Sequence, residues 1–168
     1  MQMIFQDPYE SLNPRWSIKD IIKEPLDIHN IGALNDREEA VVEILRTVGL
    51  TPPENYLSRY PHEISGGQRQ RVSIARTLIM KPKFVICDEP TSMLDVSIRI
   101  SIMDLMLNLA KDLDVSYLYI THDLAVARYM CNRIAVMFNG KIVEIADTED
   151  LLQNPIHPYT CLLYTSDA

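Results

Sequence analysis

Residues 64–95 read ISGGQRQRVSIARTLIMKPKFVICDEPTSMLD, and this stretch decides the fold. It begins with a glycine pair, 66–67, where a helix is predicted to start. Glycine lets a phosphate approach backbone N–H groups closely, and a helix N-terminus carries partial positive charge. The apolar run 84–87 then predicts a buried strand that delivers Asp88 and Glu89 to its C-terminal end. Carboxylates at such a strand end can hold a metal ion and polarise water, so the stretch indicates phosphoryl chemistry.

The residues that follow the carboxylate pair predict an α/β fold, in which short apolar strands alternate with helices. An amphipathic helix is predicted over 98–113, and the next strand over 117–121. Strands over 134–138 and 141–145 flank an Asn-Gly pair, which is a strong hairpin signal. Strand–helix–strand order predicts parallel pairing in the core, with an antiparallel ribbon near the end.

The N-terminal part of the chain predicts a compact helical region, preceded by the end of a strand. Ser17 is predicted to cap a short helix that Pro25 ends. Asn35 and Glu38 form a predicted capping box for a longer helix, which Gly49 stops. The predicted inward-facing residues of these helices are Ile18, Ile21, Ile22, Val41, Ile44, Leu45 and Val48.

The composition narrows the class of protein. A net charge of -7 over 168 residues argues against a general nucleic-acid binder, so no nucleic-acid partner is expected. Arg69, Arg71 and Arg76 are therefore more consistent with a solvated helix face than with a local nucleic-acid patch. Three cysteines without metal-ligand spacing favour a reducing cytosol over a disulfide framework. Trp16 is expected to pack against other side chains, and no apolar run approaches the roughly 18 residues of a membrane span.

Several motifs occur in a fixed order along the chain. They are ISGGQ at 64–68, an apolar strand ending in Asp-Glu-Pro at 88–90, Ser-Met-Leu-Asp at 92–95, and Thr-His-Asp at 121–123. In this order they resemble the ATPase subunit of an ABC transporter, over most of the chain. Three further segments resemble the oligopeptide/dipeptide importer branch: FQDP at 5–8, SLNPR at 11–15 and NPIHPYT at 154–160.

The resemblance implies a truncated P-loop NTPase core, with a parallel sheet and an α-helical signature subdomain. It divides the chain into three parts. Residues 1–80 would hold the glutamine loop and the helical subdomain with the signature, and residues 81–160 the C-terminal part of the nucleotide-binding core. Residues 161–168 resemble a translated sequencing adapter, and we expect them to be a non-native tail of a coding read that was truncated at both ends.

The resemblance also implies roles for the residues that would hydrolyse ATP. Glu89 would be the general base that deprotonates the attacking water. His122 would contact the γ-phosphate and help to place that water. Gln6 would reach both the metal and the water, and Asp88 would hold Mg²⁺ through its water shell. ATP and Mg²⁺ are thus the implied cofactors, and Glu89, His122 and Gln6 are the implied catalytic residues.

A second implied group binds the ATP of an opposite subunit, because members of this family work as head-to-tail dimers. It consists of Ser65, Gly66, Gly67 and Gln68, with Asp95 at the dimer seam. The implied partners are a second ATPase subunit, membrane permease subunits and, indirectly, a peptide-binding protein. The implied location is the cytoplasmic face of the cell membrane, as a peripheral subunit.

One motif of the family does not occur in these 168 residues. The phosphate loop GxxxxGK[ST] cradles the phosphates of ATP, and none of the five glycines opens that pattern. We therefore expect this chain alone to be inactive, although the intact subunit would hydrolyse ATP.

Two rival functions remain open at this point. One is an ABC ATPase of DNA repair or translation; the absence of a long heptad run between Gln6 and Ser65 favours a transporter instead. The other is a non-catalytic remnant that only binds a partner. Peptide import itself rests on the branch resemblance alone.

Overall fold

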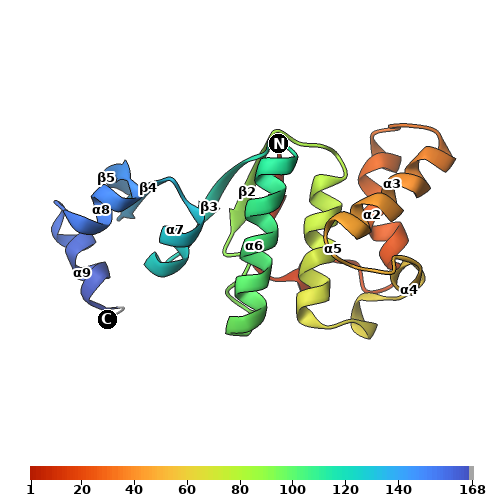
Figure 1. The fold of residues 1–168 in the computed structure, drawn as a ribbon, viewed down its shortest axis with the longest axis horizontal. Coiled ribbons are helices and arrows are strands. Elements are labelled where there is room, and N and C mark those ends of the chain that lie inside the picture. Colours follow the sequence, from red (N-terminus) through yellow and green to blue (C-terminus); the bar gives the residue numbers. More distant parts are fainter. Residues whose placement is uncertain (167–168) are drawn as a thin grey trace. The chain divides into compact units, whose positions relative to one another are not determined.

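The structure is a computed structural model that describes residues 1–166. It divides into two compact units, Met1–Leu118 and Tyr119–Ala168 (Figure 1). Among the described residues, no helix is both long enough and apolar enough to cross a membrane.

A small sheet positions the carboxylate pair in the first unit. Its strands are β1 (Gln2–Ile4), β2 (Phe84–Asp88) and β3 (Ser116–Ile120), in the order β1-β2-β3. Strands β1 and β2 run parallel, with Met3 opposite Ile86, so the predicted parallel pairing is confirmed. Because parallel strands end at the same edge, the residues that follow β1 and β2 meet there.

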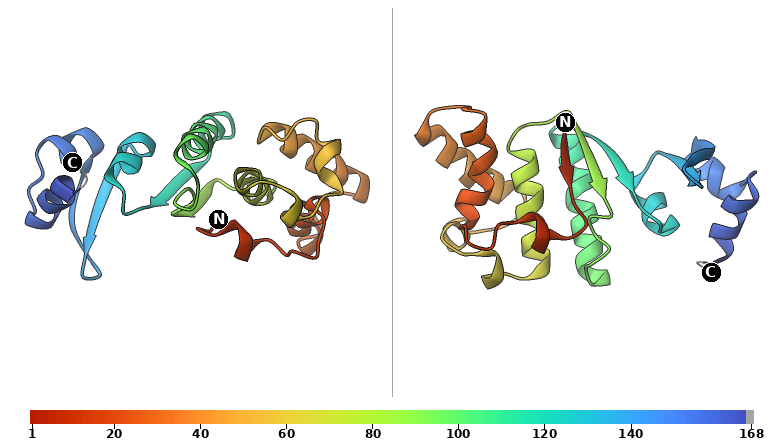
Figure 2. Two further views of the ribbon diagram at one scale, coloured as in Figure 1. Left: turned by 90° about the horizontal axis from the view of Figure 1, so that it is seen from below. Right: turned by 180° about the vertical axis from the view of Figure 1, so that it is seen from behind.

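Helix α5 (Gly66–Leu78), which begins at the predicted glycine pair, lies at the centre of the helical region. It contacts β1 and four other helices, and Figures 1 and 2 show it between α2 and α6. The four are α1 (Pro8–Ser11), α2 (Ile18–Ile28), α3 (Leu34–Thr47) and α6 (Val96–Asp112). Two short helices, α4 (Glu54–Leu57) and η1 (Pro61–Glu63), precede α5. Its buried apolar residues, such as Ile74 and Leu78, form the middle of the core.

Helix α2 is longer than the sequence predicts. Ser17 caps it as predicted, because its hydroxyl accepts a hydrogen bond from the Asp20 N–H at 3.2 Å. Pro25 does not end the helix, so that prediction is wrong. Proline removes one helical hydrogen bond, yet the helix continues because Leu26 is buried in the next turn and the His29 N–H still reaches the Pro25 carbonyl at 3.2 Å.

Helix α3 begins two residues earlier than the predicted capping box allows. Its N-cap is Ala33, whose N–H donates to the Asp36 carboxylate at 3.2 Å. Asp36 thus accepts the hydrogen bond from the N-cap N–H that we predicted for Glu38. The reciprocal bond of a capping box, from a helix N–H to the N-cap side chain, is not possible because alanine has no acceptor atom. The predicted inward-facing residues of α2 and α3 all lie in the core, so these predictions are confirmed.

The second unit is built on a hairpin. Strands β4 (Arg133–Phe138) and β5 (Lys141–Asp147) pair antiparallel around Asn139 and Gly140, both of which have positive φ angles, as predicted for an Asn-Gly turn. Val136, Leu151 and Leu152 form its core. The helices of this unit are α7 (Leu124–Met130), α8 (Thr148–Gln153) and α9 (Pro158–Ser166). Residues 161–166 of the predicted non-native tail lie in α9, and residues 167 and 168 lie outside the described residues.

Candidate functional site

The edge of the sheet brings two of the predicted catalytic residues into contact. Asp88 is the last residue of β2, Glu89 follows it, and Gln6 lies just after β1. The side-chain amide of Gln6 donates to Oε2 of Glu89 at 3.0 Å. Both residues reach this edge because β1 and β2 are parallel. The roles assigned to Gln6, Asp88 and Glu89 remain predictions.

Glu89 adopts a backbone conformation that is unfavourable for a residue with a side chain. Its φ angle is 42°, in the left-handed region, which costs on the order of 1–3 kcal/mol. A tight turn holds it there, because both the N–H and the hydroxyl of Ser92 donate to the Glu89 carbonyl, at 3.1 and 3.0 Å. The result is a carboxylate whose backbone is fixed by its own turn.

Ser92 is a residue of this site that the sequence reasoning missed. Its hydroxyl also accepts a hydrogen bond from the Gln6 amide at 3.2 Å. The signal was present, since a serine three residues after a strand-end carboxylate is well placed to close a turn. Its contact with Gln6, however, spans 86 positions along the chain and could not be read from spacing.

The start of α5 is organised by a capping box. The Ser65 hydroxyl accepts from the Gln68 N–H at 3.3 Å, and the Ser65 N–H donates to the Gln68 side chain at 3.0 Å. The two glycines between them differ in their surroundings. A Cβ on Gly67 would lie 2.6 Å from a methyl carbon of Ile98 on α6, whereas a Cβ on Gly66 would meet Leu94 at an ordinary 3.8 Å. Close packing against α6 therefore explains Gly67 without a ligand.

The three arginines of α5 bind the protein's own chain. Arg69 is only 6% exposed and donates to the carbonyls of Pro61 and Ile64, at 2.9 and 2.6 Å. Arg71 donates to the Val48 carbonyl and the Ser101 hydroxyl, at 2.6 and 2.9 Å. Arg76 forms an ion pair with Glu24 at 2.6 Å. These arginines form neither a nucleic-acid patch nor a solvated helix face. The prediction of a solvated face, which the sequence favoured, is therefore wrong.

Two other predicted site residues lie beside the starts of helices α6 and α7. Asp95 is exposed at the N-cap of α6, and its carbonyl accepts from the Arg99 N–H at 2.8 Å. His122 is exposed in the second unit, just before α7. Asp123 caps that helix by accepting from the N–H groups of Ala125 and Val126, at 2.8 and 3.1 Å. The assigned roles of Asp95 and His122 also remain predictions.

The sheet edge carries oxygen ligands of the kind that Mg²⁺ prefers. In the part of the chain that the structure describes, no three acidic, histidine or cysteine side chains form a metal-binding group. Such a group is not required, because Mg²⁺ is usually held by one or two carboxylates together with phosphate oxygens and water. Asp88 at the end of β2 is a carboxylate of this kind, and the Gln6 side chain, whose amide nitrogen donates to Glu89, adds an amide oxygen at the same edge.

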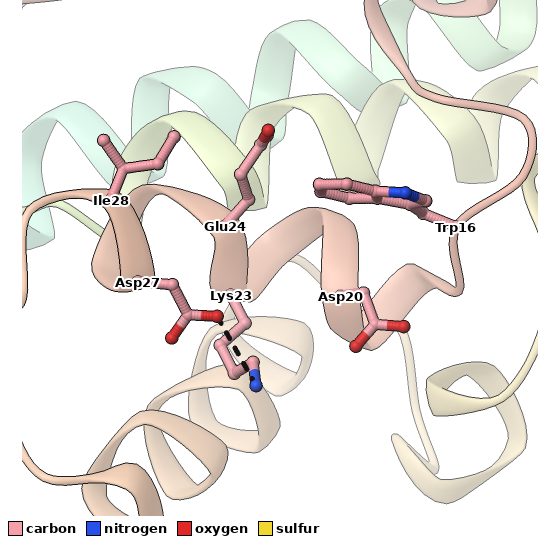
Figure 3. Close-up of a pocket in the computed structure, with 6 residues that line it drawn as sticks. All are labelled: Trp16, Asp20, Lys23, Glu24, Asp27 and Ile28. Atoms are coloured by element: carbon pink, nitrogen blue, oxygen red, sulfur yellow. Dashed lines mark ion pairs between the residues drawn. The ribbon is translucent and has the colours of Figure 1, made fainter.

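A separate surface pocket of about 360 Å³ lies along α2 (Figure 3). Its lining residues are Trp16, Asp20, Lys23, Glu24, Asp27 and Ile28. Trp16 is 40% exposed here rather than packed in the core, so that expectation is wrong. Two of the carboxylates are neutralised, because Asp27 pairs with Lys23 and Arg37 while Glu24 pairs with Arg76. The pocket therefore offers little uncompensated charge.

The amino-acid sequence of the chain is similar to a known family and to several known proteins. The family described as "ABC transporter" matches residues 1–92. The chain is 53% identical over 161 residues to the oligopeptide transport ATP-binding protein OppF of Bacillus subtilis, covering 95% of this chain and 52% of the relative. It is 52% identical over 167 residues to AmiF of Streptococcus pneumoniae, also named an oligopeptide transport ATP-binding protein, covering 99% and 54%. The dipeptide transport ATP-binding protein DppF of Lactococcus lactis is 49% identical over 166 residues, covering 98% and 53%.

The fold also matches a solved structure. It is the ATP-binding cassette MJ0796 in a dimeric, post-hydrolysis state bound to ADP and Pi, with a TM-score of 0.72 and 30% sequence identity. The match covers 87% of this chain and 62% of that one. The chain spans about half the length of the curated relatives it matches.

Proposed function

Because this chain belongs to the ABC transporter family of ATP-binding proteins, we propose that it is part of the ATP-hydrolysing subunit of an importer for di- or oligopeptides. The observation that carries the proposal is the contact of Gln6 with Glu89, at 3.0 Å, at the edge of the sheet where Asp88 ends β2. This edge offers a base, a metal ligand and a polar amide within one small region.

In the proposed reaction, Glu89 accepts the proton of the water that attacks the γ-phosphate of ATP. Its fixed backbone turn keeps the carboxylate at the sheet edge. Asp88 and Gln6 would hold Mg²⁺, which neutralises charge that develops on the phosphates when it is bound. The Gln6 amide keeps the Glu89 carboxylate oriented through its hydrogen bond. His122 would contact the γ-phosphate.

The start of α5 serves a second ATP in this proposal, one that is held by an opposite subunit. Helix geometry leaves the N–H groups of Gly66 and Gly67 without acceptors inside the helix, and the helix dipole favours an anion at this end. Ser65 and Gln68 complete this half-site, while Asp95 lies at the seam between subunits. The dimeric state of the solved relative supports this arrangement.

The substrate and the partners are inferred from the relatives. Two of the relatives above are named for oligopeptide transport and one for dipeptide transport. A di- or oligopeptide is therefore the proposed cargo, brought by a peptide-binding protein to a permease pair. The ATPase subunit would sit on the cytoplasmic face of the membrane, bound to the permease and not to the lipid.

The phosphate loop provides the test, because these 168 residues lack it. We define the chimeric subunit as this chain preceded by the part of Bacillus subtilis OppF that lies before the segment matching this chain. The chimeric subunit should hydrolyse ATP in the presence of Mg²⁺, and the 168-residue chain alone should not. Turnover by the chain alone would refute its proposed inactivity, whereas a folded chimeric subunit without turnover would refute the proposed function.

A further inference from the structure

Ser92 occupies the junction between the two residues of the sheet edge. Its hydroxyl donates to the Glu89 carbonyl at 3.0 Å and accepts from the Gln6 side chain at 3.2 Å. The Gln6 amide nitrogen carries two hydrogens, so it can serve Ser92 and the Glu89 carboxylate at the same time. The three residues thus close a ring of hydrogen bonds, to which Glu89 contributes both its carboxylate and its backbone carbonyl.

The direction of these bonds fixes what each group can do. A hydroxyl has one hydrogen, and Ser92 uses it on the Glu89 carbonyl. Its oxygen is then available only as an acceptor toward Gln6, which requires the amide nitrogen of Gln6, and not its oxygen, to face Ser92. The Glu89 carboxylate requires the same orientation, so Ser92 is a second acceptor that holds the Gln6 side chain in it.

The same residue connects the ring to α6. The guanidinium of Arg99 lies 3.4 Å from the Ser92 carbonyl and 3.5 Å from the Leu94 carbonyl. These contacts link the turn after Glu89 to the first turn of the helix that Asp95 begins. A movement of the N-terminus of α6 would therefore change the position of Ser92 through these contacts.

We propose that Ser92 is a positioning residue, which holds Gln6 against Glu89 and orients both for hydrolysis. This inference rests on the proposed function for the roles of Gln6 and Glu89. Ser92 itself touches neither water nor phosphate in the proposal, and it acts through its two neighbours.

The chain itself provides the first test, by nuclear magnetic resonance of the Gln6 side-chain amide. Its signals are identified by their loss in Gln6→Ala. The Ser92→Ala variant keeps the backbone hydrogen bond of the turn, at 3.1 Å, and removes only the hydroxyl. We expect it to shift the Gln6 amide signals and speed their exchange with water, whereas Ser92→Thr restores them. Ser97→Ala, at an exposed serine on α6, is the matched control. Unchanged Gln6 signals in Ser92→Ala would overturn the proposal, whether or not any subunit hydrolyses ATP.

The chimeric subunit provides the second test. Ser92→Ala should lower kcat about tenfold, the value of one lost hydrogen bond, with little change in KM for ATP. Ser92→Thr should recover most of the rate, and Ser97→Ala should match the unmodified subunit. In a Gln6→Ala background, Ser92→Ala should cost almost nothing more, because the two residues act together. An active chimeric subunit in which Ser92→Ala has no effect, or in which the two losses simply multiply, contradicts the proposal.

Discussion

At the scale of single residues, the two glycines at the start of α5 differ in how much room their surroundings leave for a side chain. Gly67 is buried against α6, where a Cβ would lie 2.6 Å from a methyl carbon of Ile98. Gly66 has room for a methyl group, since its nearest neighbour would be Leu94 at 3.8 Å. Close packing therefore requires a glycine only at Gly67, and the packing does not explain the glycine at Gly66.

Alanine substitutions test whether close packing requires glycine at each of the two positions. Gly67→Ala should lower the free energy of unfolding by about 1–3 kcal/mol, because the added methyl group overpacks the contact with Ile98. Gly66→Ala should leave it unchanged or raise it, since alanine favours helix. Urea unfolding of the 168-residue chain measures both. Equal losses in the two variants would show that the packing argument is wrong.

The sequence predicted that Gln6 and Glu89 share a site, and it did not predict the contacts that they make. Motif order placed Gln6 and Glu89 in one site, and the structure brings their side chains together. It could not reveal Ser92 as the third member, because that contact depends on the pairing of distant strands. The arginines of α5 were misread because helical position alone does not say whether a long side chain reaches water or a neighbouring carbonyl.

At the scale of elements, Arg69 connects α5 to the segment that leads into it. Its guanidinium serves two carbonyls at once, those of Pro61 and Ile64. Both bonds come from one terminal nitrogen of the guanidinium. Arg69→Lys keeps the charge but has a shorter, more flexible side chain that does not hold a donor at this point, so it should lower the free energy of unfolding by about 1–3 kcal/mol. Arg46→Lys, at a side chain that is 61% exposed, should change it by less than about 0.5 kcal/mol. If urea unfolding gave the same free energy for both variants, the proposed role of the two Arg69 hydrogen bonds would be wrong.

Glu144 fastens the segment before α9 to strand β5. Its carboxylate accepts hydrogen bonds from the Thr160 hydroxyl at 2.6 Å and from the N–H groups of Ile156 and His157, at 2.9 and 3.0 Å. These bonds, the one from Thr160 foremost, lower the pKa of Glu144 from its ordinary value of 4.5. The ionised form therefore stabilises this attachment above pH 4.5, and the stabilisation is lost as the pH falls through the lower folded pKa.

The amide proton signals of Ile156 and His157 should report this titration. From neutral pH to about pH 3, both should shift together, with a midpoint below the ordinary value for glutamate. In Glu144→Gln the shared transition should disappear, because the side chain no longer ionises. A transition centred above pH 4.5 would contradict the assignment of these hydrogen bonds.

Periodicity located the elements more reliably than it located their ends. The hairpin, the strand before Asp88 and the inward faces of α2 and α3 follow the predicted patterns. The end of α2 does not, because burial of Leu26 outweighs the hydrogen bond that Pro25 removes. The start of α3 also differs, since any carboxylate in the first turn can accept from the N-cap N–H, and Asp36 does so in place of Glu38.

At the scale of the whole molecule, the proposed function assigns parts of two different half-sites to the first unit. The start of α5 is proposed to face the ATP of a partner, and the edge at Glu89 the ATP of its own subunit. Cβ atoms placed on Gly66 and Gly67 would meet Leu94 and Ile98, so the start of α5 packs against the turn and helix that follow Glu89. Sequence motifs could predict both half-sites, but only the fold shows that the start of α5 lies against the turn and helix after Glu89.

The central claim is that Glu89 is the base for ATP hydrolysis, and its most direct test is the turnover rate of the chimeric subunit with Glu89→Gln. We predict a loss of about 100- to 10,000-fold in kcat, with ATP still bound. Glu43→Gln, at an exposed glutamate on α3, should retain the full rate. A Glu89→Gln subunit that hydrolyses ATP as fast as the Glu43→Gln control would contradict the account.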